Sequence, residues 1–425
     1  MGASRLAAFP APGALRRNLV LDVGAAVGVG VTTALVVSLL PTVARRGGLD
    51  PVGLALLAAA PFVANLLALF SGRIGPRTPR QLAFTRAAGA MLLLLIVLLP
   101  VPLVLTAVSL GFWISISFAT PLQQRMWGAM YPARERGRLI GMVQTGKAAA
   151  AGAAVLLGGI VADRIGGLAV VALAGLVGAI CATAAGGFRA PLAADTPVFS
   201  ARECWAAFSS RPALRRVGTA QAFFGGGLIA AAPLYALVQV DRLHLSLAAV
   251  GVIGIVASVA TVVSCLAWGA LADRRGGLSA IQLGSILGFV SLIVYAMAPS
   301  VGFVLVAAAC VGLANASTDV GISSVLGEHT TLEDRAAAMA GFNALTGARG
   351  IVAPFLAAIL VQTGAVNVTG ALLLCALSTG VGMVLYFRLT PAGDTRPWSA
   401  VVQQNGVNSG LRRAWALVPS LSLRG

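Results

Sequence analysis

The stretch LAVVALAGLVGAICATAAGGF, Leu168–Phe188, is a run of apolar residues without a single charged side chain. A helix needs about 20 such residues to cross the hydrocarbon core of a bilayer. The run mixes Leu, Ala, Val and Gly, and it lacks the strict alternation of polar and apolar residues that marks a strand of a membrane barrel. The stretch therefore predicts a membrane-spanning α-helix.

Eleven other runs of this kind lie on either side of it. The first is too long for the apolar core of a signal peptide and is followed by many more, so we count it as a span. The sequence thus predicts an all-α membrane protein with twelve transmembrane helices. The twelve runs are Asn18–Leu40, Val52–Phe70, Leu82–Leu99, Leu103–Leu122, Leu139–Ala162, Leu168–Phe188, Val217–Val240, Ala248–Ala272, Ile281–Ala298, Val301–Leu326, Ala336–Val361 and Ala365–Leu389.

The composition of the whole chain supports this interpretation. Hydrophobic residues make up 58% of the 425 residues, charged residues make up 10%, and the mean hydropathy is +0.92. Soluble domains carry about 25% charged residues. A net charge of +17 is typical of nucleic-acid-binding proteins, but no segment is long and polar enough to form a soluble binding domain. We therefore expect a lipid bilayer around the chain and no nucleic-acid partner.

The basic residues are distributed unequally between the two membrane faces. One side comprises the amino terminus, the connections after even-numbered runs and the carboxyl terminus. It holds 24 Lys and Arg residues when Arg86 and Arg388, near the ends of their runs, are counted with the adjoining loop and tail. The other side holds four, and two more lie within runs. Because cytoplasmic loops carry the excess of Lys and Arg, the sequence predicts that both termini are cytoplasmic. We expect a multi-pass protein of the cytoplasmic membrane.

A long polar segment divides the runs into two sets of six. It suggests an organisation into an amino terminus (1–17), an N-terminal six-helix bundle (18–188), a central cytoplasmic linker (189–216), a C-terminal six-helix bundle (217–389) and a cytoplasmic tail (390–425). Within the linker, Ser200–Ser209 is either a short amphipathic helix on the membrane surface or part of an irregular basic connection.

Related motifs follow the second run of each half. The chain reads Gly269-Ala-Leu-Ala-Asp273-Arg274-Arg275-Gly276-Gly277 in one half and Gly72-Arg73-Ile-Gly75-Pro-Arg77 in the other, at an offset of 201 residues. Both copies fall on the cytoplasmic side. They resemble the signature loop of the major facilitator superfamily, and the twelve runs, the central linker and the cytoplasmic termini are similar to that family as well.

The resemblance covers nearly all of 18–389 and implies a fold and a mode of action. It implies two six-helix bundles built from inverted repeats around a central cavity that opens alternately to each side. Two departures reduce the similarity to proton-coupled drug exporters. The first copy has Gly72 in place of the Asp, and the fifth run, around Gly152–Gly159, lacks the proline of the efflux-type signature.

The loop residues are candidates for a cytoplasmic gate. The resemblance implies that the loop carboxylate caps a helix of the opposite bundle, so that Asp273 would meet the start of the fifth run. The first copy is expected to face acids in the loop before the eleventh run. The alternative is a set of solvated charges that contribute little individually. The gate candidates are Gly269, Asp273, Arg274, Gly276, Arg73, Gly75, Arg77, Glu333 and Asp334.

Four ionisable residues within the runs stand out, because each costs about 2.5–3.5 kcal/mol to insert. Lys147, the only lysine, and Arg349 occupy related positions in the fifth and eleventh runs, whereas Asp22 and Asp319 lie in the first and tenth. The two bases are expected either to converge on one anionic ligand or to pair internally, Arg349 with Asp319 and Lys147 with Asp22. The acids are then structural partners or proton carriers.

Uncharged polar residues support a cavity between the bundles. They occur in the second, fifth, seventh, tenth and eleventh runs, and we expect the third, sixth, ninth and twelfth to lack buried amides and to form the outer layer. Hydrogen bonding between helices is the alternative explanation. These substrate or coupling candidates are Asn65, Gln144, Gln221, Tyr235, Asn315 and Asn343.

Together these features predict a secondary active transporter that moves a small organic solute by alternating access, with proton-coupled import or exchange of organic anions favoured. Proton-coupled multidrug efflux is one alternative, and a non-transporting receptor or lipid-handling protein of the same fold is another. No nucleophile–base or metal-ligand constellation is present, so we expect neither an enzyme nor a metal site. We further expect a proton as the coupling ion, no cofactor and a monomer.

Overall fold

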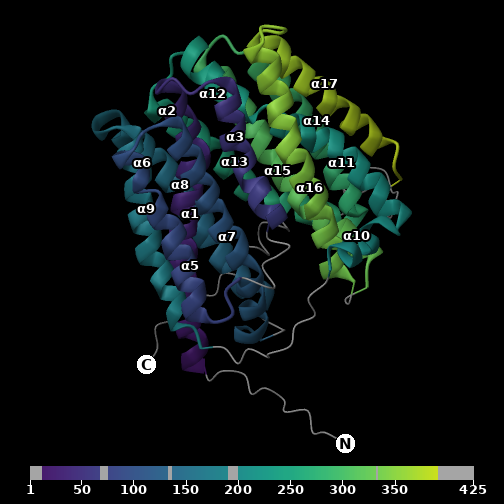
Figure 1. The fold of residues 1–425 in the computed structure, drawn as a ribbon. Helices are drawn as coiled ribbons and strands as arrows, with labels where there is room; N and C mark the ends of the chain where they lie inside the picture. Colours follow the sequence, from purple (N-terminus) through teal and green to yellow (C-terminus); the bar gives the residue numbers. More distant parts are fainter. Residues whose placement is uncertain (1–11, 68–74, 133–135, 190–199, 332–333, 391–425) are drawn as a thin grey trace, which may run out of the picture.

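The computed structural model describes residues 12–67, 75–132, 136–189, 200–331 and 334–390, and over these ranges it consists of helices and short connections (Figure 1). The first half of the chain forms one group of packed helices. Its elements are α1 (Pro12–Ser38), α2 (Leu40–Arg46), α3 (Pro51–Leu67), α5 (Pro79–Leu92), α6 (Leu95–Leu98), α7 (Pro102–Met130), α8 (Arg136–Ile165), α9 (Gly167–Thr183) and η2 (Ala184–Gly187).

The second half forms a corresponding group, joined to the first through α10 (Ala201–Ser209). In the seventh span the helix ends at Ala230, restarts before Pro233 and finishes in a π-helical turn. The elements of this half are α11 (Pro212–Ala230), α12 (Ala232–Leu237), η3 (Val238–Arg242), α13 (Leu247–Arg275), α14 (Gly277–Ala296), α15 (Val301–His329), α16 (Arg335–Gln362) and α17 (Val368–Phe387).

The spans agree with the twelve runs predicted from the sequence. Eleven stretches of the described chain are long and apolar enough to cross a membrane, and the twelfth, α3, is a shorter apolar helix of 17 residues. The predicted second run reaches Phe70, and its last residues lie outside the described ranges. The prediction of an all-α membrane protein is thus confirmed.

The two helix groups touch through small residues. Helix α8 crosses α13 so closely that a Cβ atom on Gly159 would lie 2.4 Å from the carbonyl oxygen of Leu247. A Cβ atom on Gly251 of α13 would lie 2.6 Å from the carbonyl oxygen of Val155. Small residues allow such backbone approach between membrane helices, where packing rather than water exclusion drives association. The α8–α13 crossing is therefore one tight contact between the groups.

The molecule has two unlike ends. We call the end where α1 begins and α10 lies the linker end, and the end with α2 and α12 the far end (Figure 1). Several hydrogen bonds join the two groups at the far end, for example from Thr42 Oγ1 to Gln239 Oε1 at 2.8 Å. Toward the linker end the helices diverge (Figure 1). The structure is closed at the far end.

The linker contains the short helix that was one of the two interpretations of Ser200–Ser209. Ser200 and Glu203 cap each other's backbone N–H groups, and these hydrogen bonds from Ser200 lower the pKa of the Glu203 carboxyl. The apolar side chains of Cys204 and Phe208 are buried against α16 and α11. Helix α10 thus packs on the protein, while Trp205 is half exposed.

Candidate functional site

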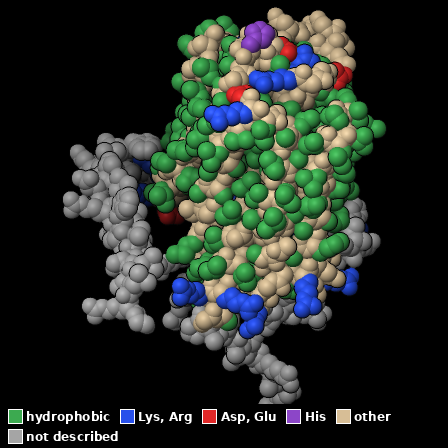
Figure 2. All heavy atoms as spheres, turned by 90° about the vertical axis from the view of Figure 1, so that its left-hand side faces the viewer, with side chains coloured by type: hydrophobic (Ala, Val, Ile, Leu, Met, Phe, Trp, Pro, Cys, Tyr) green, Lys and Arg blue, Asp and Glu red, His purple; other side chains and the backbone are tan. Residues whose placement is uncertain are grey.

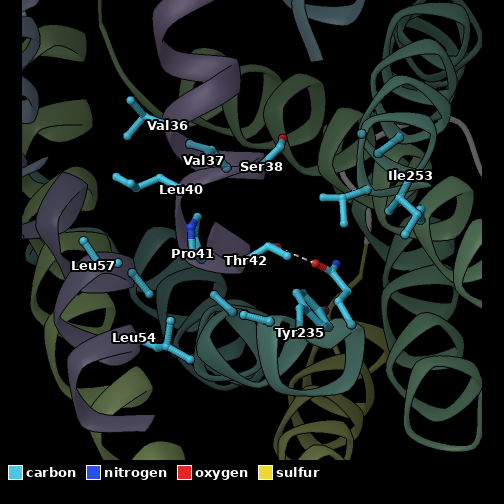
Figure 3. A pocket seen from close by; sticks show the side chains of 18 of the residues that line it. Val36, Val37, Ser38, Leu40, Pro41, Thr42, Leu54, Leu57, Tyr235 and Ile253 are labelled. Carbon is cyan, nitrogen blue, oxygen red and sulfur yellow. Dashed lines mark hydrogen bonds between the residues drawn. The ribbon is translucent and has the colours of Figure 1, made fainter. Parts of the chain in front are cut away.

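An apolar cavity lies between the two helix groups near the far end (Figure 3). Its volume is about 310 Å³, and its walls come from α1, α2, α3 and α7 on one side and α12 to α15 on the other. Val36, Leu57 and Ile253 give it an apolar surface. The predicted residue Tyr235 lines it from α12, and its ring lies 4.3 Å from that of Tyr295.

The hydrogen bond from Thr42 to Gln239 crosses this cavity's wall and is drawn as a dashed line in Figure 3. Gln239 in turn donates to the Tyr295 hydroxyl at 3.0 Å. Beyond it, the guanidinium of Arg45 forms an ion pair with Asp241 at 2.7 Å. These contacts join α2 to η3 and close the cavity toward the far end.

A second, polar pocket of about 120 Å³ lies inside the N-terminal group. It is formed by α1, α5, α7 and α8 and contains two of the predicted intramembrane charges, Asp22 and Lys147. The predicted residue Gln144 also lines it and is exposed. The exposed side chains of Gln144 and Gln124 mark the rim of the pocket.

Asp22 is held by three donors from α7 and the residue that follows it. Its Oδ1 accepts from Gln123 Nε2 at 2.7 Å. Its Oδ2 accepts from Trp127 Nε1 at 2.6 Å and from the Tyr131 hydroxyl at 2.7 Å. An ionised carboxylate only accepts hydrogen bonds, so this environment matches a charged Asp22. The side chain is almost fully buried, with 1% exposed.

Arg86 completes this network, and its position corrects our assignment of the basic residues. We counted it with the loop after the second run, but it lies in α5 and is buried. Its guanidinium donates to Gln123 Oε1 at 2.7 Å, so Gln123 bridges Arg86 and Asp22. The signal that could have identified it is its place one turn inside the third apolar run.

Lys147 does not pair with Asp22. Among the described residues, the Lys147 ammonium makes no ion pair or hydrogen bond, and the donors that hold the Asp22 carboxylate lie on α7 or at Tyr131. The expected internal pairing of these two residues is therefore absent in this conformation. The pocket lining contains two basic side chains, Arg86 and Lys147, and one acid, Asp22.

Arg349 lies in the C-terminal group and turns away from this pocket. Its guanidinium donates to the backbone carbonyl of Gln221 on α11 and lies against Gly225. The side chain of Gln221 accepts a hydrogen bond from the Tyr386 hydroxyl of α17. The conformation thus shows neither the convergence of Arg349 and Lys147 nor the pairing of Arg349 with Asp319 within the described part of the chain.

The remaining polar candidates are spread over several helices. Asn65 accepts a hydrogen bond from the Ser117 hydroxyl at 3.0 Å, which links α3 to α7. Asp319, Asn315 and Asn343 have exposed side chains that make no hydrogen bond with other described residues. In the ninth span, the half-buried amide of Gln282 on α14 donates to the carbonyl oxygens of Tyr386 and Leu389.

The gate candidates of the second motif copy make no ion pair or hydrogen bond through their side chains with the described residues of the opposite helix group. Asp273 and Arg274 are exposed, and a Cβ atom on Gly269 would meet no atom within 4 Å. Asp334 pairs with Arg211 at the start of α11, at 2.6 Å, which is a contact within its own helix group. In that copy, Gly75 and Arg77 lie in the connection before α5, whereas Arg73, like Glu333, lies outside the described residues.

A carboxylate does cap a helix of the opposite group, but at the far end. Asp163, near the end of α8, accepts from the backbone N–H groups of Leu247 and Ala248 at 2.9 Å each. These two residues begin α13, whose exposed N–H groups and dipole favour a negative charge. The contact therefore joins the two helix groups at the α8–α13 crossing.

The sequence contained an overlooked signal for this contact. Asp163 lies in Gly159-Ile-Val-Ala-Asp163-Arg164-Ile-Gly166-Gly167, which matches the motif at 269–277 in six of nine positions. In both copies the penultimate glycine has a positive φ, 93° at Gly166 and 81° at Gly276, and the next residue begins a helix. We compared only connections on the predicted cytoplasmic side and so missed a copy on the other side.

The comparisons with known proteins agree with this architecture. The model of the Major Facilitator Superfamily matches residues 23–307 and 243–422. Among solved structures, a mutant of the nucleoside transporter NupG matches with a TM-score of 0.72 and 11% identity, covering 87% of this chain and 99% of that one. A bacterial homolog of the human lysosomal transporter Spinster, in an inward-facing and unoccupied conformation, matches with a TM-score of 0.66 and 14% identity over 89% and 97%.

A third similar structure is a transporter of the POT family in complex with a thioalcohol-conjugated peptide, with a TM-score of 0.68, 11% identity and coverage of 87% and 95%. No curated protein matches the chain by sequence. The chain belongs to the Major Facilitator Superfamily, and it is a multi-pass membrane protein of the secondary-transporter class. This family is not enzymatic, and the described residues contain no cluster of His, Cys, Asp and Glu able to hold a metal ion.

Proposed function

We propose that the protein transports a small organic anion and that Lys147 binds the anionic group. The observation that carries the proposal is the charge of the polar pocket. Arg86 is linked through Gln123 to Asp22, so one positive charge is balanced by the one acid of the lining. The Lys147 ammonium remains without a counter-ion among the described residues of this partly buried pocket, and a carboxylate or phosphate would supply it.

The apolar cavity above this pocket suits the uncharged part of such a substrate. Binding sites for small molecules are mostly apolar, with a few polar groups that fix the orientation of the ligand. In the predicted orientation the linker end is cytoplasmic, so this conformation is inward-facing. Closure at the far end prevents exchange with the other side, as alternating access requires.

We also propose that one carboxylate stabilises closure of the far end and another stabilises closure of the linker end, in alternation. Asp163 caps α13 in the present conformation, and Asp273 is expected to cap the start of α8 when the linker end closes. The two helices are antiparallel neighbours, so the end of each lies near the beginning of the other at opposite faces. Gly159 packs against the backbone of α13, whereas Gly269, its counterpart in the other motif copy, faces open space. This difference supports the exchange.

The proposal is tested by flux and binding in the purified protein. We would reconstitute it in vesicles, screen carboxylates, phosphate esters and neutral analogues by thermal shift across pH, and measure uptake of those that stabilise it. Loss of a charge-assisted hydrogen bond costs about 1.5–3 kcal/mol. Lys147→Ala should therefore weaken binding of the anion about 10- to 100-fold.

Two variants act as controls for this experiment. Lys147→Arg keeps the charge and should retain most of the anion binding. Arg349→Ala removes a base that braces α16 against α11 and should lower stability without selectively weakening the anion. Uptake of the same anion by Lys147→Ala at the wild-type rate would contradict the proposal.

Proton-driven efflux of lipophilic compounds is the second candidate. It is favoured by the apolar lining of the 310 Å³ cavity, which includes Trp113 and Tyr235. In that case Asp22 or Asp319 would carry the coupling proton. Lys147→Ala would leave transport of the lipophilic compounds intact, whereas Asp22→Asn would abolish its dependence on a proton gradient.

A further inference from the structure

We propose that the linker end carries two equivalent arginine sites, one in each helix group, that bind the phosphate-bearing headgroup of an anionic membrane lipid. The sites lie at the outer rim of each group. They are separate from the transport pathway and do not depend on the substrate proposed above.

The first site is a cavity of about 600 Å³ at the linker end of the N-terminal group. Its basic residues are Arg17 at the start of α1, Arg80 at the start of α5 and Arg189 just after η2. Its lining contains no acid among the described residues. Within the same part of the chain, none of these three guanidinium groups has an ion-pair or hydrogen-bond partner, so their donors are available to a ligand.

The second site is a cavity of about 220 Å³ at the same end of the C-terminal group. It is lined by Arg216 of α11, His329 at the end of α15 and Arg388 just after α17. Its acid, Glu328, is engaged with the backbone, because Glu328 Oε1 accepts from the N–H of Gly277 at 3.0 Å. The two arginines make no side-chain contact of this kind within the described chain.

The two sites occupy equivalent places in the internal repeat. Arg17 and Arg216 are separated by 199 residues, and Arg189 and Arg388 are separated by the same number. In each group one arginine lies in the first turns of the first span and the other follows the sixth span. An excess of Lys and Arg on one membrane face does not by itself produce this matched spacing.

The backbone that carries the second arginine is fixed by a polar side chain in each half. Asn18 of α1 donates to the carbonyl oxygen of Arg189 at 2.8 Å and accepts from its N–H at 3.1 Å. In the other half, Gln282 of α14 donates to the carbonyl of Leu389, next to Arg388, at 3.0 Å. In each half, a side chain from a different helix thus fixes the backbone at or beside the second arginine. This is expected of a site whose arginine must keep its position.

Exposed apolar side chains lie beside the arginines and indicate a lipid as the ligand. On α5, Phe84 lies one turn beyond Arg80 on the same helix face and is 74% exposed. On α17, Val384 lies one turn before Arg388 and is 47% exposed. The apolar surface of the N-terminal group ends at a row of basic side chains (Figure 2). A phosphate at the arginines would place acyl chains along this surface, as basic pockets at membrane faces do.

The experiment counts the lipids that the purified protein retains by native mass spectrometry. The protein is equilibrated with phosphatidylglycerol and phosphatidylethanolamine, and the wild type should keep two phosphatidylglycerol molecules in preference to the zwitterionic lipid. Arg17→Gln with Arg189→Gln should remove one of them, and Arg216→Gln with Arg388→Gln the other. We expect each pair of substitutions to weaken phosphatidylglycerol retention on the order of tenfold.

A matched control removes two arginines from the same end of the molecule. Arg202→Gln with Arg215→Gln changes the net charge equally but affects neither cavity, so two lipids should remain. Loss of lipid in this control as well would show general charge attraction and overturn the proposal. It would also be overturned if soluble glycerol phosphate stabilised the protein as strongly as phosphatidylglycerol, because the ligand would then be a free phosphate.

Discussion

Asp22 illustrates how an isolated charge is retained inside a helix bundle. Three donors surround its carboxylate, and Arg86 lies one residue further along the same network. The apolar runs drew attention to Asp22 and Lys147, because a charge within a span needs a compensating role. They did not indicate Gln123 or Trp127 as partners, since that pairing depends on how α7 packs beside α1.

A substitution at Asp163 tests whether its contact with the start of α13 stabilises closure of the far end. Asp163→Asn removes the negative charge at the start of α13 and keeps one acceptor, so the far end should open more often. A helix-terminal charge contributes about 0.3–1 kcal/mol, or up to about 2 kcal/mol when partly buried. The balance between the two conformations should therefore shift about two- to thirtyfold. Spin labels at the exposed residues Leu99 and Met297, in a background without the five native cysteines, would report the distance across the far end.

Asp273→Asn is the reciprocal variant. It should favour the present conformation, because the contact that it weakens forms only when the linker end closes. Equal distance distributions in the wild type and both variants would refute the exchange of carboxylates.

At the level of elements, the α8–α13 crossing determines how far the far end can close. Gly159 is in contact with the α13 backbone, and its counterpart Gly269 faces open space. Gly159→Ala should separate the two helices and destabilise the closed far end by about 1–3 kcal/mol, as overpacking does in other cores. Gly269→Ala should leave the present conformation unchanged and should destabilise the conformation in which the linker end is closed.

Thermal unfolding together with the spin-label distances would check this pair. The two glycine variants should move the conformational balance in opposite directions. A shift in the same direction for both would mean that the crossing acts as a structural support and does not take part in the exchange.

Most of the elements could be predicted from the sequence, because an apolar run of bilayer length has few other structures available to it. The ends of the helices were harder to predict from the sequence. Helix α7 continues to Met130, eight residues beyond the apolar run, because Gln123 and Trp127 find buried partners that composition does not reveal. The interruption before Pro233 is different, because proline lacks a backbone N–H and disturbs the preceding helical turn, so the sequence does contain a signal for it.

At the scale of the whole molecule, the far-end contacts act together. Thr42 with Gln239, Arg45 with Asp241 and Asp163 with the start of α13 all join the same two helix groups. The internal repeat and the long polar linker allowed the two-bundle fold to be predicted. The conformation could not be predicted, because both ends carry the residues needed for closure and only their contacts decide which one is closed.

A cross-link at the far end tests whether closure there is part of the transport cycle. The side chains of Thr42 and Gln239 are in contact, so Thr42→Cys with Gln239→Cys in the cysteine-free background should form a disulfide on oxidation. Transport should fall on the order of tenfold or more and recover on reduction, because the far end must open in every cycle. Either substitution alone should be insensitive to oxidant. Undiminished transport by the oxidised protein would show that this end need not open.

The single lysine allows chemical labelling to report on one internal position of the native protein. Apart from the amino terminus, Lys147 carries the only primary amine of the chain, and it faces a pocket whose rim is exposed. An amine-reactive footprinting reagent would therefore mark one internal position, which peptide mass spectrometry can quantify without any engineered probe. Its rate of modification from each side of a sealed vesicle would measure how long each side of the pathway stays open, and a bound substrate would protect it.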